Sequence, residues 1–245
     1  MRADVYAVED AIERDHWWFT GRRRLFSRIL ERLGIDRGAE CLDIGTSTGG
    51  NLRMLKDLGF RRVTGLDASD AAIAFCEAKG LGPVKKGDVC NLPFEDGRFR
   101  FVLATDVIEH VDDDRRALRE IDRVLAPGGF VLITVPAFPS LWGLQDDVGQ
   151  HRRRYLRGRL VPAIREAGLR PTECFYFNYL LFGPIWLARQ VIRFLKRPLK
   201  SENQVNTPLL NFLLGHIFAV DVLTAPLLKP PFGVSLLVLC EKPAS

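Results

Sequence analysis

Short apolar runs alternate with amphipathic segments through the first half of the chain. The runs CLDIG, VTGLD, FRFVLATD and FVLITVP each have the length of one buried strand, and PVKKGDV gives a weaker one. Between them, SDAAIAFCEAKG and DDDRRALREIDRVL have the apolar spacing of helices, and we expect Pro127-Gly128-Gly129 to end the second helix. This alternation predicts an α/β fold with a doubly wound, mostly parallel sheet and right-handed crossovers.

The second half of the chain is less regular. Residues 137–150 predict a loop, 156–168 a helix closed by Gly168, and PTECFYF and GVSLLVLCEKP the sixth and seventh strands. Residues 178–232 separate these two strands, far more than a hairpin needs, so we interpret them as a helical insertion. The predicted organisation is a helical cap over 1–38 and a seven-stranded domain over 39–242, with a functional loop at 137–160.

The N-terminal cap has the pattern of two helices over residues 6–33. Thr20 is a candidate N-cap for the second helix, and Gly34 is placed to end it. Trp17 and Trp18 are adjacent and cannot share one narrow helix face, so we expect at least one of them to pack outside its own helix.

The insertion predicts two helices of different character. The first, IWLARQVIRFLKR, places a basic face opposite a Trp/Ile/Leu face, an arrangement that suits an anionic membrane surface; its basic residues are Arg189, Arg193, Lys196 and Arg197. The second starts at Thr207-Pro208 and is apolar nearly all round. Its polar residues argue against a bilayer span: Asn211, His216 and Asp221. Three roles for the insertion stay open: cover of a pocket, peripheral membrane contact and a dimer interface.

Composition narrows the class of protein. The net charge is +5 and the pI about 9.1, with basic residues gathered locally, yet no nucleic-acid-binding module is visible, so we expect no nucleic-acid partner. Five scattered cysteines, none spaced as C-x-x-C, indicate a reducing compartment and no disulfide framework. The acidic, polar first residues do not resemble a signal peptide. We therefore expect a cytoplasmic protein, with peripheral contact at the inner face of a membrane as an option.

Glycines and acids follow the predicted strands where a ligand would bind. In CLDIGTSTGG, Asp43 and Gly45 close a strand and Gly49-Gly50 opens a helix, a turn at which the backbone can approach a ligand. Asp67 ends the next strand, where an acid can accept hydrogen bonds from both hydroxyls of a ribose. Asp88 and Val89 follow the third strand and are placed to meet an adenine ring. The pattern predicts a nucleoside or nucleotide ligand and is compatible with NAD.

The order LDIG, GLDAS, GDVCNLPF, FVLATDVIEHV, RVLAPGG resembles the class I S-adenosylmethionine-dependent methyltransferases. The resemblance covers residues 39–136 and the last strand. It implies a donor site that includes Asp43, Gly45, Ser47, Gly49, Asp67, Asp88, Val89, Thr105 and Asp106. Ser47 departs from the family, which usually has glycine there. The segment HWWF followed by GRRR looks like the capping helix of such enzymes, and adds Trp18 and Arg22, the latter facing the donor's carboxylate.

Two segments hold candidates for the chemistry of the acceptor. Glu109 and His110 follow the fourth strand, and a histidine titrates in the range of a general base. With Asp106 their spacing also resembles a divalent-metal cluster of ubiquinone-pathway O-methyltransferases, but we assign no metal ligand. His151 is another catalytic candidate, and the residues after it could bind an anionic acceptor through guanidinium and hydroxyl groups: Arg153, Arg154 and Tyr155.

The sequence thus predicts an S-adenosylmethionine-dependent methyltransferase acting on a small or lipid-like acceptor, with oxygen the expected methylated atom and an anionic group on the acceptor an option. The loop at 137–160 would then lie on the acceptor side. An NAD-linked oxidoreductase and a non-catalytic S-adenosylmethionine-binding protein are the alternatives.

Overall fold

The computed structural model describes residues 3–195 and 207–244 and contains one seven-stranded sheet. The strand order is β3-β2-β1-β4-β5-β7-β6, and only β7 runs antiparallel to its neighbours. The strands are β1 (Glu40–Ile44), β2 (Arg62–Asp67), β3 (Val84–Lys86), β4 (Phe99–Thr105), β5 (Leu125–Pro136), β6 (Arg170–Phe177) and β7 (Ser235–Glu241). The predicted mostly parallel α/β sheet is confirmed.

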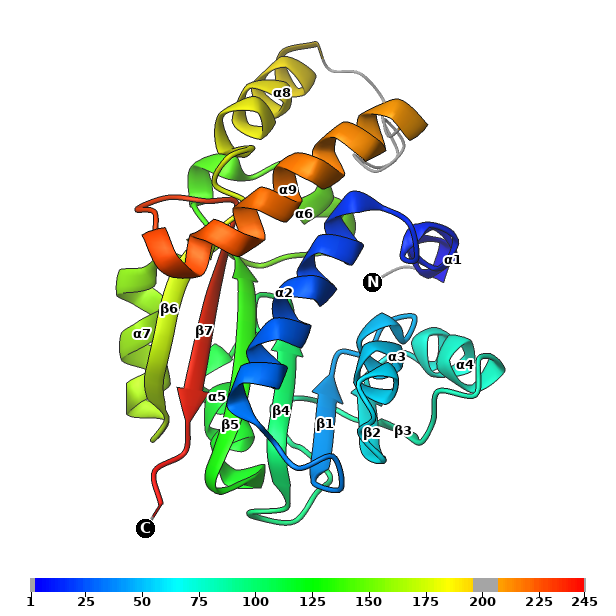
Figure 1. Cartoon of the computed structure of the whole chain (residues 1–245), viewed down its shortest axis with the longest axis vertical. Coiled ribbons are helices and arrows are strands. Elements are labelled where there is room, and N and C mark those ends of the chain that lie inside the picture. The colour runs from blue at the N-terminus through cyan, green and yellow to red at the C-terminus, as the bar shows by residue number, and fades with distance from the viewer. Residues whose placement is uncertain (1–2, 196–206, 245) are drawn as a thin grey trace.

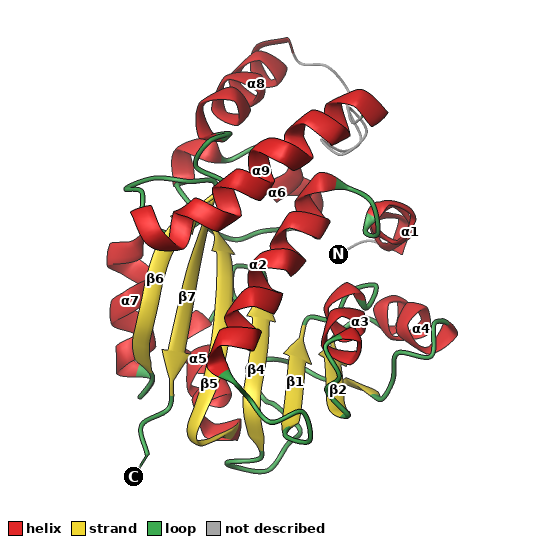
Figure 2. Ribbon diagram, viewed as in Figure 1, coloured by secondary structure: helices red, strands yellow, loops and turns green. Residues whose placement is uncertain are grey.

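Helices cover both faces of the sheet (Figures 1 and 2). On one face α5 (Asp114–Val124) and α7 (Arg157–Glu166) pack on one set of alternating strand residues. On the other face lie α2 (Trp17–Leu33), α3 (Gly50–Asp57), α4 (Asp70–Ala78) and α9 (Pro208–Leu228). Successive strand residues point to opposite faces, so Leu42 and Val102 belong to the first core and Cys41 and Phe101 to the second.

The N-terminal cap consists of α1 (Ala3–Ile12) and α2. Gly34 ends α2 in the left-handed conformation, as predicted, but the N-cap is His16 and not Thr20. The His16 ring accepts a hydrogen bond from the amide of Trp18, and Thr20 lies one turn inside the helix, where its hydroxyl bonds to the backbone of His16. Pattern alone missed this start because histidine is an uncommon N-cap.

Two other boundaries differ from the prediction. Helix α5 ends at Val124, and Pro127-Gly128-Gly129 lie within β5, where the Gly128 amide donates to the carbonyl of Lys242. Residues 137–150 are not only a loop: they contain a short 3₁₀ turn (Pro139–Leu141) and α6 (Leu144–Gly149).

The insertion between β6 and β7 contains α8 (Phe182–Leu195) and α9, both beyond the carboxyl ends of the parallel strands (Figure 1). Thr207 caps α9, as predicted. Asp221 on α9 is buried and accepts hydrogen bonds from the amides of Asn178 and Leu180, which ties the helix to the end of β6.

The predicted basic face of α8 is wrong at Arg189. This side chain is buried, donates to the carbonyl of Leu141 and lies 3.8 Å from Asp146. Lys196 and Arg197, and the side chain of Arg193, lie outside the described residues.

Candidate active site

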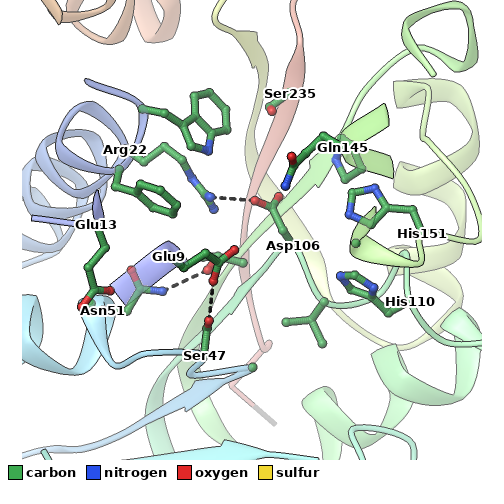
Figure 3. Close-up of a pocket in the computed structure, with 18 of the residues that line it drawn as sticks. Glu9, Glu13, Arg22, Ser47, Asn51, Asp106, His110, Gln145, His151 and Ser235 are labelled. Atoms are coloured by element: carbon green, nitrogen blue, oxygen red, sulfur yellow. Dashed lines mark hydrogen bonds and ion pairs between the residues drawn. The ribbon is translucent and has the colours of Figure 1, made fainter. Parts of the chain in front are cut away.

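A cavity of about 1330 Å³ opens at the carboxyl ends of β1, β2, β4 and β5. Between β1 and β4 the strand order reverses: β2 and β3 are added on one side of β1, and β4 and β5 on the other. Doubly wound sheets bind their ligands at the carboxyl end of such a reversal. The cap helices α1 and α2 form one side, and α8 and α9 also contribute to the lining. Figure 3 shows the side chains converging on this space from several elements.

The turn after β1 forms the floor of the cavity. Gly45 and Ser47 line it, and Ser47 takes a left-handed backbone with a φ of 46°. A glycine adopts this conformation without strain, so the serine here bears a backbone cost. The Ser47 hydroxyl donates to Glu9 at 2.7 Å, which gives the side chain a partner on α1 (Figure 3).

Asp67 lies at the end of β2 with both carboxylate oxygens held. One oxygen accepts from the amide of Ser69 at 2.9 Å and the other from the amide of Ser47 at 3.0 Å. Each carboxylate oxygen can accept a second hydrogen bond, so Asp67 is fixed in place and can still receive two hydroxyls. Asp88 and Val89 line the same part of the cavity.

Two predicted donor-site residues do not line the cavity. Asp43 is fully buried under the turn, where Asn51 donates to one of its oxygens and burial raises its pKa to about 8. Gly49 has a φ of 91°, and a Cβ there would lie 2.6 Å from Leu81. Both residues therefore support the conformation of the turn without lining the cavity.

Arg22 and Asp106 both line the cavity and form an ion pair there, with their nearest atoms 2.7 Å apart (Figure 3). Thr134 bonds to both of them, and the guanidinium lies over the ring of Trp18. The Arg22 Nε is buried without a partner among the described residues. Thr105, beside Asp106, lines the cavity and accepts from Asn51 at 3.0 Å.

Helix α1 and the turn after it add acids that the sequence interpretation missed. Glu9 and Glu13 line the cavity, and Glu13 accepts from Thr48 at 2.6 Å and from Lys79 at 2.8 Å. Burial raises the pKa of Glu9. Tyr6, Glu9 and Glu13 are spaced by three and four residues, a helix-face signal that could have identified them.

Residues 42–133 match a sequence family described as "Methyltransferase domain". Residues 42–133 are therefore similar to a methyltransferase domain, in a chain with the fold of S-adenosylmethionine-dependent methyltransferases. A probable S-adenosylmethionine-dependent methyltransferase of Mycolicibacterium smegmatis is 30% identical over 123 residues, which are 50% of this chain and 46% of that protein. A demethylmenaquinone methyltransferase of Staphylococcus aureus is 33% identical over 129 residues, 48% of this chain and 54% of that protein. The chain thus spans about half the length of these relatives.

The fold similarity extends further than the sequence similarity. A solved Haloferax volcanii complex between the Trm112 methyltransferase activator and a methyltransferase aligns with a TM-score of 0.65 at 22% identity, covering 99% of this chain and 96% of that one. The alignment includes the segments before and after the matched family, so the cap and the insertion belong to the same overall fold.

The cavity fits S-adenosylmethionine, the cofactor of this domain family. The fixed carboxylate of Asp67 suits a ribose, and Asp88 with Val89 suits an adenine. Two buried polar atoms on the cavity wall, Nε of Arg22 and Oγ1 of Thr46, have no partner among the described residues, and a polar ligand would satisfy them. A turn that exposes backbone groups at the start of α3 completes the cradle.

The three predicted catalytic residues meet at another part of the cavity. Suitable ligand atoms of Glu109, His110 and His151 all lie within 4.8 Å of one another, and the two imidazole rings are 4.7 Å apart, edge to face. Burial, with the neighbouring His151, lowers the pKa of His110 to about 4, so its ring is neutral at pH 7. Burial raises the pKa of Glu109 well above its usual range.

The arginine cluster divides between the cavity and the protein interior. Arg154 lines the cavity but is buried and bound to Asp146 at 2.8 Å. Arg153 donates to the carbonyls of Val111 and Asp112, and the Tyr155 hydroxyl is 2.8 Å from Asp114. Neither Arg153 nor Tyr155 lines the cavity; both fasten the loop to the segment after β4. Arg152 is the cluster's other cavity residue.

Asp146 was missed by the sequence interpretation and holds this side of the cavity together. It is fully buried, lies 2.8 Å from Nδ1 of His151 and also pairs with Arg154. These partners lower its pKa to about 2, against the effect of burial. No local motif marks the residue, because its partners are assembled only when α6 folds.

Proposed function

We propose that the chain transfers a methyl group from S-adenosylmethionine to an oxygen of a small or lipid-like acceptor. The observation that carries this proposal is the continuity of the cavity. It runs from the strand edge with Asp67 and Asp88 to apolar residues of the insertion, Ile185 and Ala188 on α8 and Leu210 and Leu214 on α9. A polar nucleoside end and an apolar end in one space suit a polar donor and an apolar acceptor.

For methyl transfer, the protein must align the acceptor oxygen, the methyl carbon and the sulfur and exclude water from them; it need not form a covalent intermediate. The acceptor oxygen attacks the methyl carbon, the carbon–sulfur bond breaks, and its electron pair returns to sulfur. Asp67 and Arg22 would hold the donor, while Trp18 and the insertion keep water from the reacting atoms. The neutral imidazole of His110 is a candidate to accept the hydroxyl proton, although its lowered pKa makes it a weak base without help.

The S. aureus relative supports a lipid-like acceptor, since its name specifies demethylmenaquinone. An anionic group on the acceptor is supported by Arg152 and Arg154, which line the cavity. Each of them already pairs with a carboxylate, of Asp112 and Asp146 respectively.

The outer surface of the insertion supports peripheral contact with the inner face of a membrane. Helix α9 has the length and apolarity of a bilayer span, with a mean hydropathy of 1.6, and only 22% of that segment is buried. Its buried residues nevertheless pack on α2 and on the end of β6, which suits a helix lying on a surface. Large apolar side chains stay exposed: Trp186, Leu187 and Val191 on α8, and Leu209, Phe212, Leu213, Val220, Leu223, Leu227 and Leu228 on α9.

Three experiments test the proposal and the surface contact. Calorimetry should show binding of S-adenosylhomocysteine and none of NADH; the reverse would favour an NAD-linked oxidoreductase. Methyl-labelled S-adenosylmethionine should label a long-chain phenol but not its methyl ether, because the ether has no free hydroxyl. Donor binding without label transfer to any phenol or alcohol would favour a non-catalytic binding protein. Sedimentation with anionic vesicles tests the surface contact, with self-association as the other outcome.

A further inference from the structure

Glu109, His110 and His151 form a compact cluster at the cavity wall. Glu109 and His110 follow β4, and His151 follows α6, so the cluster joins two segments far apart in sequence. Figure 3 shows His110 and His151 side by side, near the space that Asp106 and Gln145 also face. One ligand atom from each of the three residues lies within 4.8 Å of the other two. Two atoms bonded to one ion through bonds of about 2.0–2.2 Å lie at most about 4.4 Å apart, so small shifts of these side chains would let the three atoms bind one ion.

The carboxylate of Glu109 is the feature that calls for a ligand. The residue is 0% exposed, and neither carboxylate oxygen has a hydrogen-bond partner among the described residues. A buried carboxyl group without a partner destabilises the folded state, and native proteins avoid it unless something else binds there. Here the unpartnered group lies next to two imidazole rings at the cavity.

Both imidazoles are oriented by other groups, as metal-binding histidines are. Nδ1 of His151 lies 2.8 Å from Asp146, and Asp146 is itself fixed by Arg154, so Nε2 of His151 is left with a lone pair. The His110 ring lies edge to face against the His151 ring at the cavity, where a neutral imidazole offers one nitrogen lone pair. One nitrogen lone pair from each ring and the carboxylate of Glu109 form a ligand set.

We propose that Glu109, His110 and His151 bind a divalent transition-metal ion on the acceptor side of the cavity. Two imidazole nitrogens and one carboxylate suit Zn²⁺, Mn²⁺, Fe²⁺ or Co²⁺ better than Mg²⁺, which prefers oxygen ligands. Because His110 and His151 line the cavity while Glu109 lies behind them, the ion's remaining coordination positions face the acceptor.

On this proposal, which rests on the proposed function, the ion replaces the weak base. A hydroxyl bound to the ion loses its proton to water at a much lower pH than a free hydroxyl does. The oxygen then attacks the methyl carbon, and the sulfur leaves with the electron pair of the broken bond. Asp146 acts on this site as a positioning residue through His151.

Metal binding can be measured without turnover. Chelator-treated protein titrated with Zn²⁺ by calorimetry should bind one equivalent, and Co²⁺ should give a visible absorption band. Glu109→Gln and His151→Ala should each weaken Zn²⁺ binding at least about 10-fold, the size expected for loss of a ligand or its orienting partner. His216→Ala, an exposed histidine on α9, is the matched control and should bind as the wild type does.

S-adenosylhomocysteine affinity separates this proposal from the proposed function. It should be unchanged in Glu109→Gln, which shows that the variant is folded and that the donor site is independent of the ion. If wild-type protein binds neither Zn²⁺ nor Co²⁺ stoichiometrically, or if both ligand variants bind Zn²⁺ as tightly as the wild type does, the metal site is wrong even though methyl transfer stands. Should Glu109→Gln fail to fold, the wild-type titration and the His151→Ala variant test the metal site.

Discussion

The two ends of the cavity are built in different ways. At the donor end, the functional groups lie where parallel strands end and are held by residues that follow β1 and β2: Ser47 and Ser69 hold Asp67, and Asn51 holds Thr105. At the acceptor end, the groups include residues of α6, α8 and α9, and these helices are positioned by packing and by contacts such as that of Asp221 with Asn178. The donor end is set by sheet register, and the acceptor end is set by tertiary packing.

The strongest test of this contrast is at Phe218, which holds the insertion to the cap. Phe218 is fully buried, stacks on Trp18 and packs against Trp17 and Gly21. Phe218→Ala should lower the free energy of unfolding by about 3–5 kcal/mol, the usual cost of an emptied aromatic site. Denaturant unfolding measures it. Phe212→Ala, 61% exposed on the same helix, should change it by no more than about 0.5 kcal/mol. Equal effects would mean that α9 does not dock as described.

At the donor end, Asp67→Ala should weaken S-adenosylhomocysteine binding by about 1.5–3 kcal/mol, because charged hydrogen bonds to the ribose are lost. Calorimetry measures the change, and circular dichroism confirms folding. Asp70→Ala is the control: Asp70 lies three residues away, its side chain is 79% exposed, and it pairs with the surface Lys86. A folded Asp67→Ala with wild-type affinity would refute the donor site.

At the acceptor end, Leu214→Gln should lower kcat/KM for a lipid-like acceptor about 10-fold and leave donor affinity unchanged, because it places an amide in the apolar lining. Leu213→Gln is the matched control, since Leu213 is half exposed and does not line the cavity. Kinetics with a long-chain and a short-chain acceptor provide the measurement. If the two variants behave alike, α9 does not contact the acceptor.

The smallest expected effect concerns the backbone of Ser47. Ser47→Gly and Ser47→Ala both lose the hydrogen bond to Glu9, but only glycine relieves the left-handed φ of 46°. The glycine variant should therefore be about 1 kcal/mol more stable than the alanine variant. Thermal unfolding compares them, and a more stable alanine variant would argue against the left-handed turn.

The contrast also explains what the sequence could and could not predict. The positions of Asp67 and Asp88 at the cavity were predictable, because the two residues lie at or just after strand ends, and strand ends meet at one edge of a parallel sheet whatever the rest of the chain does. The roles of Asp146 and Arg154 were not, because a local pattern does not show that one buried acid will hold a histidine and two arginines. The prediction for Arg189 was wrong for the same reason: its helical spacing suggests an exposed basic face, but tertiary packing buries the side chain.

The most direct test of the central account is a structure of the protein with S-adenosylhomocysteine bound. We expect the ribose on Asp67, the adenine at Asp88 and Val89, and the sulfur facing the part of the cavity lined by His110, Leu210 and Leu214. The space beside the sulfur should be polar at the histidines and apolar at α8 and α9. A ligand bound away from Asp67, or a sulfur that faces away from His110 and the insertion, would contradict a single cavity in which donor and acceptor meet.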